Sequence, residues 1–247
     1  VYYPPREERV SHFRPGKDFA RITVLNAVLC FLAVVYGLPL TVFRGLMTLL
    51  RTVYALVFFM FTTFFMMTPL VHIYLLFGKI TEKKKYNLHR ILNFMAKFVI
   101  CYHKIPGVRY TQKNNSGEDF TKPAVIICNH QSHLDLAPLL ALTPKVIVLT
   151  ADWVWNNPVY RFTIRNAEYL PASSGMDAIM PQLKSLVERG YSIAIYPEGT
   201  RSMDCSLGRF RQGAFYVAQT LGIDVLPVVI YGTGKALKKR GRLLRKW

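Results

Sequence analysis

Residues 124–136 read Ala124-Val125-Ile126-Ile127-Cys128-Asn129-His130-Gln131-Ser132-His133-Leu134-Asp135-Leu136, an apolar run that passes directly into a polar segment. The run Ala124–Cys128 has the length and the β-branched content of a buried strand. The segment after it carries ionisable side chains at the point where this strand would end. In parallel α/β sheets functional groups gather beyond the carboxyl ends of the strands, so this segment is the first place to look for chemistry.

Similar apolar runs continue along the chain and alternate with helical patterns. We predict strands at Ala124–Cys128, Val146–Leu149, Ile193–Tyr196 and Val225–Ile230, and helices at Leu134–Leu142, Met176–Arg189 and Gln212–Leu221. Ser174 to Asp177 resembles a capping box that would begin the middle helix, and Gly190 would end it. The alternation of strands and helices predicts an α/β fold with a mostly parallel sheet flanked by helices.

Two long stretches without Asp, Glu, Lys or Arg lie ahead of this region, at residues 22–43 and 52–78, and only His72 interrupts the second. Each holds the roughly 20 residues that a helix needs to cross a hydrocarbon core of about 30 Å. The chain as a whole is 51% hydrophobic and has a positive mean hydropathy of +0.20. We therefore predict an N-terminal pair of transmembrane or re-entrant helices, kinked at Pro39 and Pro69. A buried helical hairpin is the alternative.

The chain is strongly basic, with 32 Lys and Arg against 14 Asp and Glu and a formal net charge of +18. This balance favours an anionic partner. The basic residues cluster on both sides of the apolar stretches, at Arg6, Arg9, Arg14, Lys17, Arg21, Lys79, Lys83, Lys84 and Lys85. By the positive-inside rule, both ends and the following domain are expected to face the cytoplasm. With no nucleic-acid-binding motif in the chain, we expect membrane lipids, and no nucleic acid, as partners.

This pattern divides the chain into three parts: a basic tail at residues 1–21, the membrane helices at 22–78 and a catalytic domain at 79–247. Tyr86–Tyr102 has the periodicity of an amphipathic helix, which would lie on the membrane surface or pack on the domain. The chain begins with Val1 and stops soon after its last apolar run. We therefore expect a segment of a larger multidomain polypeptide. Four cysteines without paired spacing predict reduced thiols.

His130 and Asp135 are the candidate catalytic pair. A histidine is a general base near neutral pH because its ordinary pKa is about 6.5. Asp135 follows five residues later, across a turn into the next helix, where its carboxylate would orient the imidazole and stabilise its protonated form. A metal site formed by His130, His133 and Asp135 is the alternative. No fourth ligand is evident, so we expect no metal.

The second polar segment follows the predicted strand Ile193–Tyr196. It contains four candidate substrate-binding residues, Glu198, Gly199, Thr200 and Arg201. Arginine offers a planar charged fork suited to phosphate. Gly199 and Thr200 would expose backbone N–H groups or a hydroxyl to an anion. Glu198 would bind a hydroxyl of the substrate or pair with Arg201.

Together, Asn129-His130-Gln131-Ser132-His133-Leu134-Asp135 and Tyr196-Pro197-Glu198-Gly199-Thr200-Arg201-Ser202 resemble the HxxxxD and EGTR motifs of the glycerophospholipid acyltransferase family, which includes the lysophosphatidic acid acyltransferases. The later run Val225-Leu226-Pro227-Val228-Val229 is similar to the last apolar motif of that family. The resemblance covers roughly Tyr86 to Tyr231. Two membrane helices ahead of the catalytic domain are also common in the family.

The resemblance implies an O-acyltransferase of phospholipid biosynthesis, bound to a membrane. His130 would deprotonate the acceptor hydroxyl and Asp135 would orient His130. The hydroxyl would attack the thioester of acyl-CoA or acyl carrier protein directly, without an acyl-enzyme and without a further cofactor. Glu198 to Arg201 would bind the acceptor, 1-acylglycerol-3-phosphate, with Arg201 on its phosphate.

One region departs from the family pattern. The family carries a basic residue between its two motifs that contributes to the phosphate site, but Ala172-Ser173-Ser174 follows Tyr169-Leu170-Pro171 here. Arg161 and Arg165 lie earlier and are possible substitutes. The departure leaves open a different acceptor, a non-glycerophosphate lipid or a polyene, and does not affect acyl transfer itself. The two membrane helices and the start at Val1 leave open a second alternative, a non-enzymatic membrane subunit of a larger polypeptide.

Overall fold

The computed structural model describes residues 14–102, 109–241 and 243–244, and the side chains of Cys101 and Tyr102 are not among the described groups. The chain divides into two compact units, residues 1–47 and 48–247. Arg6 and Arg9 of the basic tail lie outside the described residues. The predictions made for them stay predictions.

The apolar N-terminal region is helical without a break from Pro15 to Leu76. It consists of α1 (Pro15–Leu32), α2 (Leu38–Phe61) and α3 (Thr68–Leu76), joined by π-helical turns at Ala33–Gly37 and Thr62–Met67. The predicted pair of helices is not confirmed, because the segment between the two apolar stretches, residues 44–51, lies inside α2. That segment is mostly Leu, Met and Arg and contains no proline, so its helix propensity exceeds its tendency to turn.

Each π-helical turn lies just before a proline. Ala33–Gly37 precedes Pro39, and Thr62–Met67 precedes Pro69. A proline inside a helix lacks the N–H of the i→i−4 bond, and its ring clashes with the carbonyl four residues earlier. A wider turn relieves that clash without ending the helix. The prolines expected to kink the helices are therefore accommodated as local changes of helical register.

Among the described residues, the run Pro15–Leu76 is the one helix long and apolar enough to cross a membrane, with a mean hydropathy of 2.1 in its most apolar stretch. None of that stretch is buried, whereas the core helix of a soluble protein would be covered. α1 likewise has no buried residue. Buried apolar side chains appear in α3, where Val71 and Leu75 join the core of the following domain. The buried-hairpin alternative is therefore not supported.

The domain begins with α4 (Glu82–Lys97), which starts at Thr81, whose hydroxyl accepts from the backbone N–H of Lys84. Leu88, Leu92 and Met95 are buried, and α4 packs against α5 (Leu136–Leu142). The amphipathic helix predicted at Tyr86–Tyr102 therefore begins earlier and uses its apolar stripe for core packing. The remaining predicted residues, Phe98–Tyr102, form a π-helical turn.

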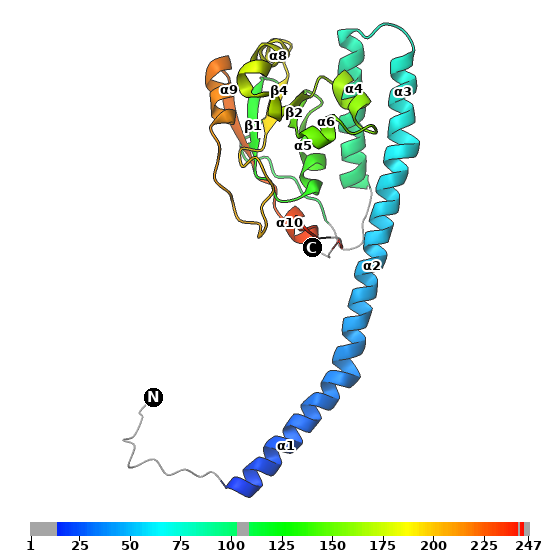
Figure 1. The fold of residues 1–247 in the computed structure, drawn as a ribbon, viewed down its shortest axis with the longest axis vertical. Helices are drawn as coiled ribbons and strands as arrows, with labels where there is room; N and C mark the ends of the chain where they lie inside the picture. The colour runs from blue at the N-terminus through cyan, green and yellow to red at the C-terminus, as the bar shows by residue number, and fades with distance from the viewer. Residues whose placement is uncertain (1–13, 103–108, 242, 245–247) are drawn as a thin grey trace, which may run out of the picture. The chain divides into compact units, whose positions relative to one another are not determined.

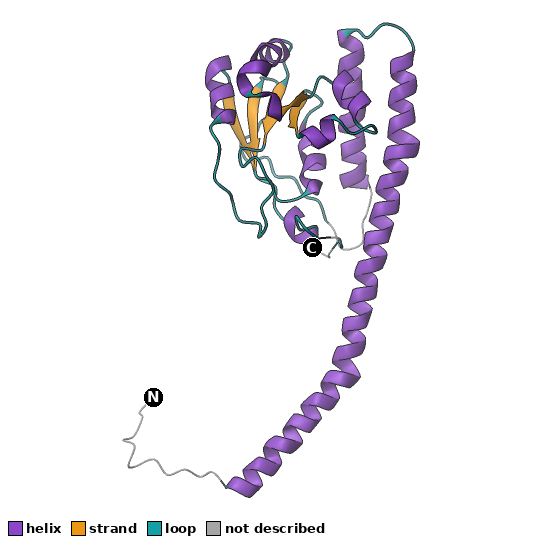
Figure 2. Cartoon of the chain, viewed as in Figure 1, coloured by secondary structure: helices purple, strands orange, loops and turns teal. Residues whose placement is uncertain are grey.

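Five parallel strands form one sheet in the order β3-β2-β4-β1-β5. They are β1 (Ala124–Cys128), β2 (Val146–Thr150), β3 (Leu170–Pro171), β4 (Ser192–Ile195) and β5 (Asp224–Val228). All four predicted strands are confirmed to within two residues at each end. The missed strand, β3, has two residues and no apolar periodicity. In Figure 2 the strands lie between helices.

The helices around the sheet follow the predicted order. Besides α5 they are α6 (Asp152–Trp155), α7 (Arg161–Asn166), α8 (Met176–Glu188), α9 (Gly213–Leu221) and α10 (Thr233–Ala236). Figure 1 shows α8 and α9 near β1 and β4, and α8 contacts β4 while α9 contacts β1. The predicted capping box at Ser174 is wrong, because Gly175 is the N-cap and no side chain caps α8. Gly190 ends α8 with a φ of 85°.

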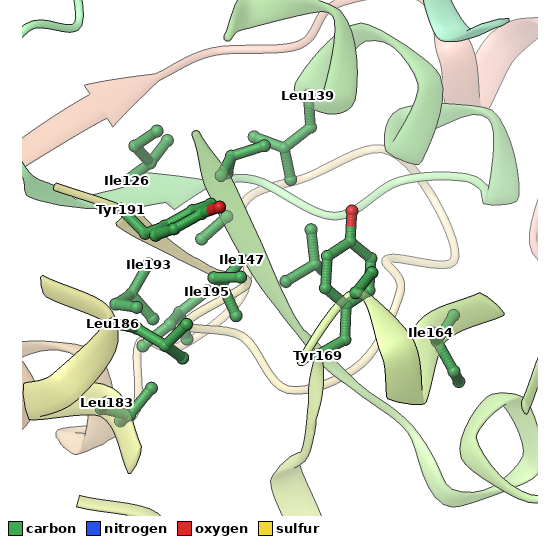
Figure 3. Close-up of a cluster of buried hydrophobic side chains, with 14 of the residues drawn as sticks. Ile126, Leu139, Ile147, Ile164, Tyr169, Leu183, Leu186, Tyr191, Ile193 and Ile195 are labelled. Carbon is green, nitrogen blue, oxygen red and sulfur yellow. The ribbon is translucent and has the colours of Figure 1, made fainter. Parts of the chain in front are cut away.

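The core lies between the strands and these helices. Figure 3 shows Ile126, Ile147 and Ile193 from neighbouring strands packed with Leu183 and Leu186 of α8. All four residues of β4 are buried, which explains why Ile193–Ile195 is apolar without alternation. Each large buried aliphatic side chain contributes about 1.5–3 kcal/mol relative to exposure. This core fixes where β1 and β4 end, and so positions the polar segments that follow them.

Candidate active site

The two polar segments lie side by side at the carboxyl edge of the sheet. β1 and β4 are hydrogen-bonded neighbours, with Ile127 paired to Ile195. Their chains therefore leave the sheet at the same place. The backbone N–H of Ser202 donates to the carbonyl of His130 at 2.7 Å, so the two segments also contact each other directly beyond the strands.

His130 and Asp135 meet as the sequence predicts. The Nδ1 atom of His130 lies 2.9 Å from Oδ2 of Asp135. Ser132 is the N-cap of a short 3-10 helix, His133–Asp135, and its backbone N–H donates to Oδ2 of Asp135 at 2.8 Å in a reciprocal capping box. The same oxygen accepts from the backbone N–H of Gln131 at 2.7 Å. Capping of this turn therefore places the carboxylate beside the imidazole, and this accounts for the spacing of the two residues.

The carboxylate of Asp135 is fully buried, at 0% exposure. Its Oδ2 atom receives three donors, while Oδ1 has no hydrogen-bond partner among the described residues. A buried carboxylate is costly unless it is paired or hydrogen-bonded. Here two backbone N–H groups and an imidazole N–H offset that cost. Because Nδ1 of His130 carries the proton toward Asp135, the basic lone pair of the neutral ring lies on Nε2, a tautomer assigned from these contacts.

Tyr196 holds the other side of the imidazole. Its ring stacks on that of His130 with centroids 4.0 Å apart and an interplanar angle of 19°. The phenol oxygen is buried and has no partner among the described residues, and burial raises the pKa of Tyr196 well above its ordinary value. The residue therefore stays neutral and serves as a flat support for His130. It is the first residue of the second motif segment, but an aromatic residue at a strand end gave no functional signal in the sequence.

Glu198 joins the two segments. One oxygen accepts from the backbone N–H of His130 at 2.9 Å, and the other accepts from the backbone N–H of Gly208 at 3.0 Å. The side chain is 6% exposed. A Cβ atom on Gly208 would lie 2.7 Å from the second carboxylate oxygen, so only glycine permits this approach. Both oxygens are thus already engaged by the protein, which makes Glu198 a clamp between the histidine and the loop at residues 202–212.

A cleft of about 600 Å³ opens beside this clamp. The predicted binding residues Glu198, Thr200 and Arg201 line it together with Arg209 and Arg211. The hydroxyl of Thr200 accepts from Nζ of Lys239 at 3.0 Å. Arg201 donates weakly, at 3.4 Å, to the carbonyl of Lys239. The cleft therefore joins the second motif to basic residues that the sequence patterns did not single out.

Gly199, the remaining predicted binding residue, allows the side chain of Arg211 to lie against the turn. Its φ is 67°, in the left-handed region that favours glycine. A Cβ atom there would lie 3.0 Å from Nε of Arg211. The guanidinium therefore passes directly over the turn, and the backbone N–H of Arg211 donates to the carbonyl of Pro197 at 2.8 Å.

The segment after the last apolar motif contributes a second support. The side-chain amide of Asn129 donates to the carbonyl of Ile230 and accepts from its backbone N–H, both at 2.8 Å. The hydroxyl of Ser132 donates to the carbonyl of Leu237 at 2.8 Å. Asn129 and Ser132 were quoted as part of the motif without a role. Their contacts span more than a hundred residues, so no local pattern marks them.

His133 and the suggested substitutes for the missing basic residue lie outside this constellation. His133 packs edge-on against Trp153, with ring centroids 5.9 Å apart. Burial, followed by the charges of Arg201 and His130, lowers its pKa. Arg165 stacks over Trp155 at 5.0 Å, and neither it nor Arg161 lines the cleft. Among the described residues, no group of three or more His, Cys, Asp or Glu side chains is arranged to hold a metal ion.

A family model described as Acyltransferase matches residues 107–231 of the chain. Among curated relatives, the chloroplastic 1-acyl-sn-glycerol-3-phosphate acyltransferase LPAT1 of Arabidopsis thaliana is 34% identical over 47% of this chain and 33% of its own length. A 1-acyl-sn-glycerol-3-phosphate acyltransferase of Chlamydomonas reinhardtii is 30% identical over 72% of this chain and 52% of its own length. The chain thus spans between a third and about half of these relatives.

A solved structure has the same fold. The crystal structure of the 1-acyl-sn-glycerophosphate acyltransferase PlsC from Thermotoga maritima superposes with a TM-score of 0.64 and covers 82% of each chain. At 21% sequence identity, this likeness shows the arrangement of helices and strands alone.

Proposed function

Because the chain belongs to the acyltransferase family, we propose that it is an O-acyltransferase that moves a fatty acyl group from a thioester to the hydroxyl of 1-acylglycerol-3-phosphate. The contact between His130 and Asp135, 2.9 Å long and beside a cleft rich in arginine, carries this proposal. The relatives named above act on the same class of acceptor by their printed names. The product would be a diacylglycerol phosphate, a precursor of membrane phospholipids.

In this mechanism His130 is the general base. The acceptor hydroxyl gives its proton to Nε2 as its oxygen forms a bond to the thioester carbonyl carbon. Asp135 stabilises the resulting imidazolium, as the acid does in a Ser-His-Asp arrangement. Collapse of the tetrahedral intermediate breaks the carbon–sulfur bond, and the proton on His130 returns to the departing thiolate. Atoms and charge balance without a further cofactor.

Transfer without an acyl-enzyme is supported by the side chains near the base. Cys128 is the nearest thiol along the chain, and burial raises its pKa to about 12. It is therefore a neutral thiol at pH 7 and a poor nucleophile. Its thiol donates to the carbonyl of Asn129 at 3.5 Å, so it already takes part in a structural hydrogen bond. The donor would be acyl-CoA or acyl carrier protein, both of which present the thioester that this reaction needs.

The proposed setting is a membrane, with the catalytic domain on the cytoplasmic side. The exposed apolar helix Pro15–Leu76 supports attachment. The basic residues Lys79, Lys83 and Lys84, which follow it, support the orientation. Trypsin added to sealed vesicles of known sidedness tests this: the domain should be cleaved only where the cytoplasmic face is outside. Cleavage of the domain only in vesicles of the opposite orientation would reverse the assignment.

The direct test replaces the base. His130→Gln, assayed in detergent with acyl-CoA and 1-acylglycerol-3-phosphate, should lower kcat by a factor of about 10³ or more. His133→Gln is the matched control, because this residue lies three positions along the same segment and should keep a rate near that of the wild type. Wild-type activity in the His130 variant would overturn the mechanism. An inactive wild-type enzyme with every thioester donor and lysolipid tested would overturn the proposed function.

A further inference from the structure

The chain lacks a positive charge where its family supplies one for the phosphate site. Ala172–Ser174 forms a short 3-10 turn in that position, and none of its side chains is charged. Arg165 is engaged with Trp155, and Arg161 does not line the cleft. A phosphate bound beside Arg201 therefore needs a positive charge from another part of the chain.

The loop that follows the second motif brings two further guanidinium groups into the cleft. Arg209 and Arg211 line it together with Arg201. In the part of the chain that the structure describes, none of the three forms an ion pair with a carboxylate. The two acidic residues of the cleft are occupied: Glu198 by backbone N–H groups, and Asp204 by Ser202 and Ser206. The cleft thus holds three guanidinium groups against two carboxylates that are engaged elsewhere, and its net charge is positive.

The backbone of Arg211 is also held in position before any ligand binds. Its N–H donates to the carbonyl of Pro197, and its side chain lies against Gly199, where a Cβ atom would be 3.0 Å from Nε. An ordered fork loses less side-chain entropy on binding an anion than a freely rotating one, and a guanidinium matches the oxygens of a phosphate in pairs.

The rest of the loop is fastened to the catalytic segment. The carbonyl of Cys205 accepts from the side chain of Gln131 at 3.1 Å. Ser202 bonds the carbonyl of His130, and Gly208 bonds Glu198, which in turn bonds the backbone N–H of His130. The position of the arginines is therefore coupled to that of His130. Such coupling is needed if the arginines are to hold the phosphate of an acceptor while its hydroxyl reacts at His130.

We propose that Arg209 and Arg211 form, with Arg201, the phosphate site of this chain, and that Arg211 makes it selective for acceptors that carry a phosphate monoester. This inference rests on the proposed function and names the group that its acceptor must carry. In this arrangement the loop at residues 202–212 replaces the charge missing at Ala172–Ser174. Arg211 is a specificity-determining residue and takes no part in proton transfer.

The test compares two acceptors on the same enzyme in detergent. Arg211→Gln should raise KM for 1-acylglycerol-3-phosphate by about tenfold to a hundredfold, as expected for a charged hydrogen bond, with a much smaller change in kcat. The rate with neutral 1-acylglycerol, which has no phosphate, should not fall. Arg211→Lys keeps the charge without the fork and should recover part of the loss. Arg209→Gln should act in the same direction.

Arg161→Gln is the matched control, because Arg161 is an exposed arginine outside the cleft, and it should leave both acceptors unaffected. An unchanged KM for the phosphate acceptor in the Arg209 and Arg211 variants would overturn the inference while the proposed function stood. An effect of Arg161→Gln equal to that of Arg211→Gln would also overturn it. A wild-type enzyme that prefers the neutral acceptor would remove the phosphate acceptor and the inference together.

A binding measurement separates the inference from turnover. sn-Glycerol 3-phosphate should raise the unfolding temperature of the wild-type protein and of Arg161→Gln, and it should lose that effect in Arg209→Gln/Arg211→Gln. Equal stabilisation of the wild-type protein and the double variant, or none of either, would overturn the inference even if acyl transfer were observed. Stabilisation that disappears in the double variant supports the site even if the donor for transfer were still to be identified.

Discussion

The sheet has a histidine packed against buried tyrosine at each of its two ends, and the two histidines differ in their neighbours. At the carboxyl edge, His130 stacks on Tyr196 and shares a hydrogen bond with a buried carboxylate. At the amino edge, His89 of α4 packs against Tyr169 and Tyr191, with ring centroids 5.7 Å and 5.0 Å apart. Figure 3 shows these two tyrosines among the aliphatic side chains of the core.

The charges around each histidine differ as well. Near His89, Glu168 pairs with both Lys85 and Arg189, each at 2.9 Å, so the charges neutralise one another. Burial lowers the pKa of His89 from its ordinary value of 6.5 to about 4. At the other edge the arginines of the cleft have no acidic partner among the described residues. His89 is thus a buried structural residue whose neighbouring charges are paired with one another. His130 is a partly exposed candidate base whose own partner is a carboxylate, and the arginines near it form no ion pair among the described residues.

The largest expected effect comes from changing the carboxylate at each edge. Asp135→Asn removes the negative charge that stabilises the protonated His130, so kcat should fall by a factor of about 10³–10⁴. Glu168→Gln, at the amino edge, should leave kcat within about threefold, because mutations distant from the reacting atoms seldom change transition-state binding. Steady-state rates of acyl transfer for the two variants provide the measurement. Comparable losses of kcat in both variants would show that catalysis does not depend specifically on the carboxylate at the carboxyl edge.

The catalytic pair was accessible from sequence because its geometry is local. His130 and Asp135 lie within one capping box that directly follows a strand, and both features leave a sequence pattern. The parallel sheet was predictable for a related reason: buried strands need apolar runs on both faces. The two-residue strand β3 could not be found, because its pairing with β2 comes from tertiary contacts.

The cleft was only half predictable. Glu198 to Arg201 belong to a motif, but Arg209 and Arg211 lie in an irregular loop whose shape depends on contacts such as that of Gly208 with Glu198. Such contacts join residues by chain folding and leave no periodicity in the sequence. For the N-terminal helices, the sequence pattern predicted a break that the structure does not contain. Arg44 and Arg51 divide the hydropathy profile into two stretches, although charge does not interrupt the backbone hydrogen bonds of a helix.

A second prediction concerns the pH dependence of stability at the amino edge. The unfolded chain protonates His89 near pH 6.5 and the folded chain near pH 4. Between these values the unfolded state binds more protons, so the folded state should lose up to about 3 kcal/mol as the pH falls from 7 to 4. Denaturant unfolding of the domain in detergent at several pH values measures this loss.

The control for that prediction is His89→Asn, which keeps a donor near Nδ1 and removes the titrating ring. It should be less stable at pH 7 and show a shallower loss of stability toward pH 4. A slope equal to that of the wild type would show that His89 is not the group responsible. The difference between His89 and His130 would then rest on their contacts alone, without the pKa of His89.

A third, smaller effect separates backbone strain from the site. Gly199 and Gly117 have nearly equal φ values, 67° and 68°, but a Cβ atom on Gly117 would meet nothing within 4 Å. Alanine at either position should cost about 1–2 kcal/mol of stability for the left-handed backbone. Only Gly199→Ala should also raise KM for the phosphate acceptor, by about tenfold, because it displaces Arg211. An equal KM for both variants would argue against a role for Arg211 in binding.

The smallest effect is expected from the ion pairs at the amino edge. Glu82 is 60% exposed and pairs with Lys85 at 2.9 Å and with Arg189, and these hydrogen bonds lower its pKa. Exposed pairs contribute about 0.2–1 kcal/mol and are screened by salt, so Glu82→Gln should reduce stability by no more than that, and the difference should shrink in 1 M salt. Glu188→Gln, an exposed residue of α8 without an ion pair among the described residues, is the control and should have no effect. Acyl transfer should be unchanged in both variants, because this network neutralises its own charges far from the arginines of the cleft. A loss of activity in Glu82→Gln would mean that the amino edge influences the catalytic edge through the sheet that connects them.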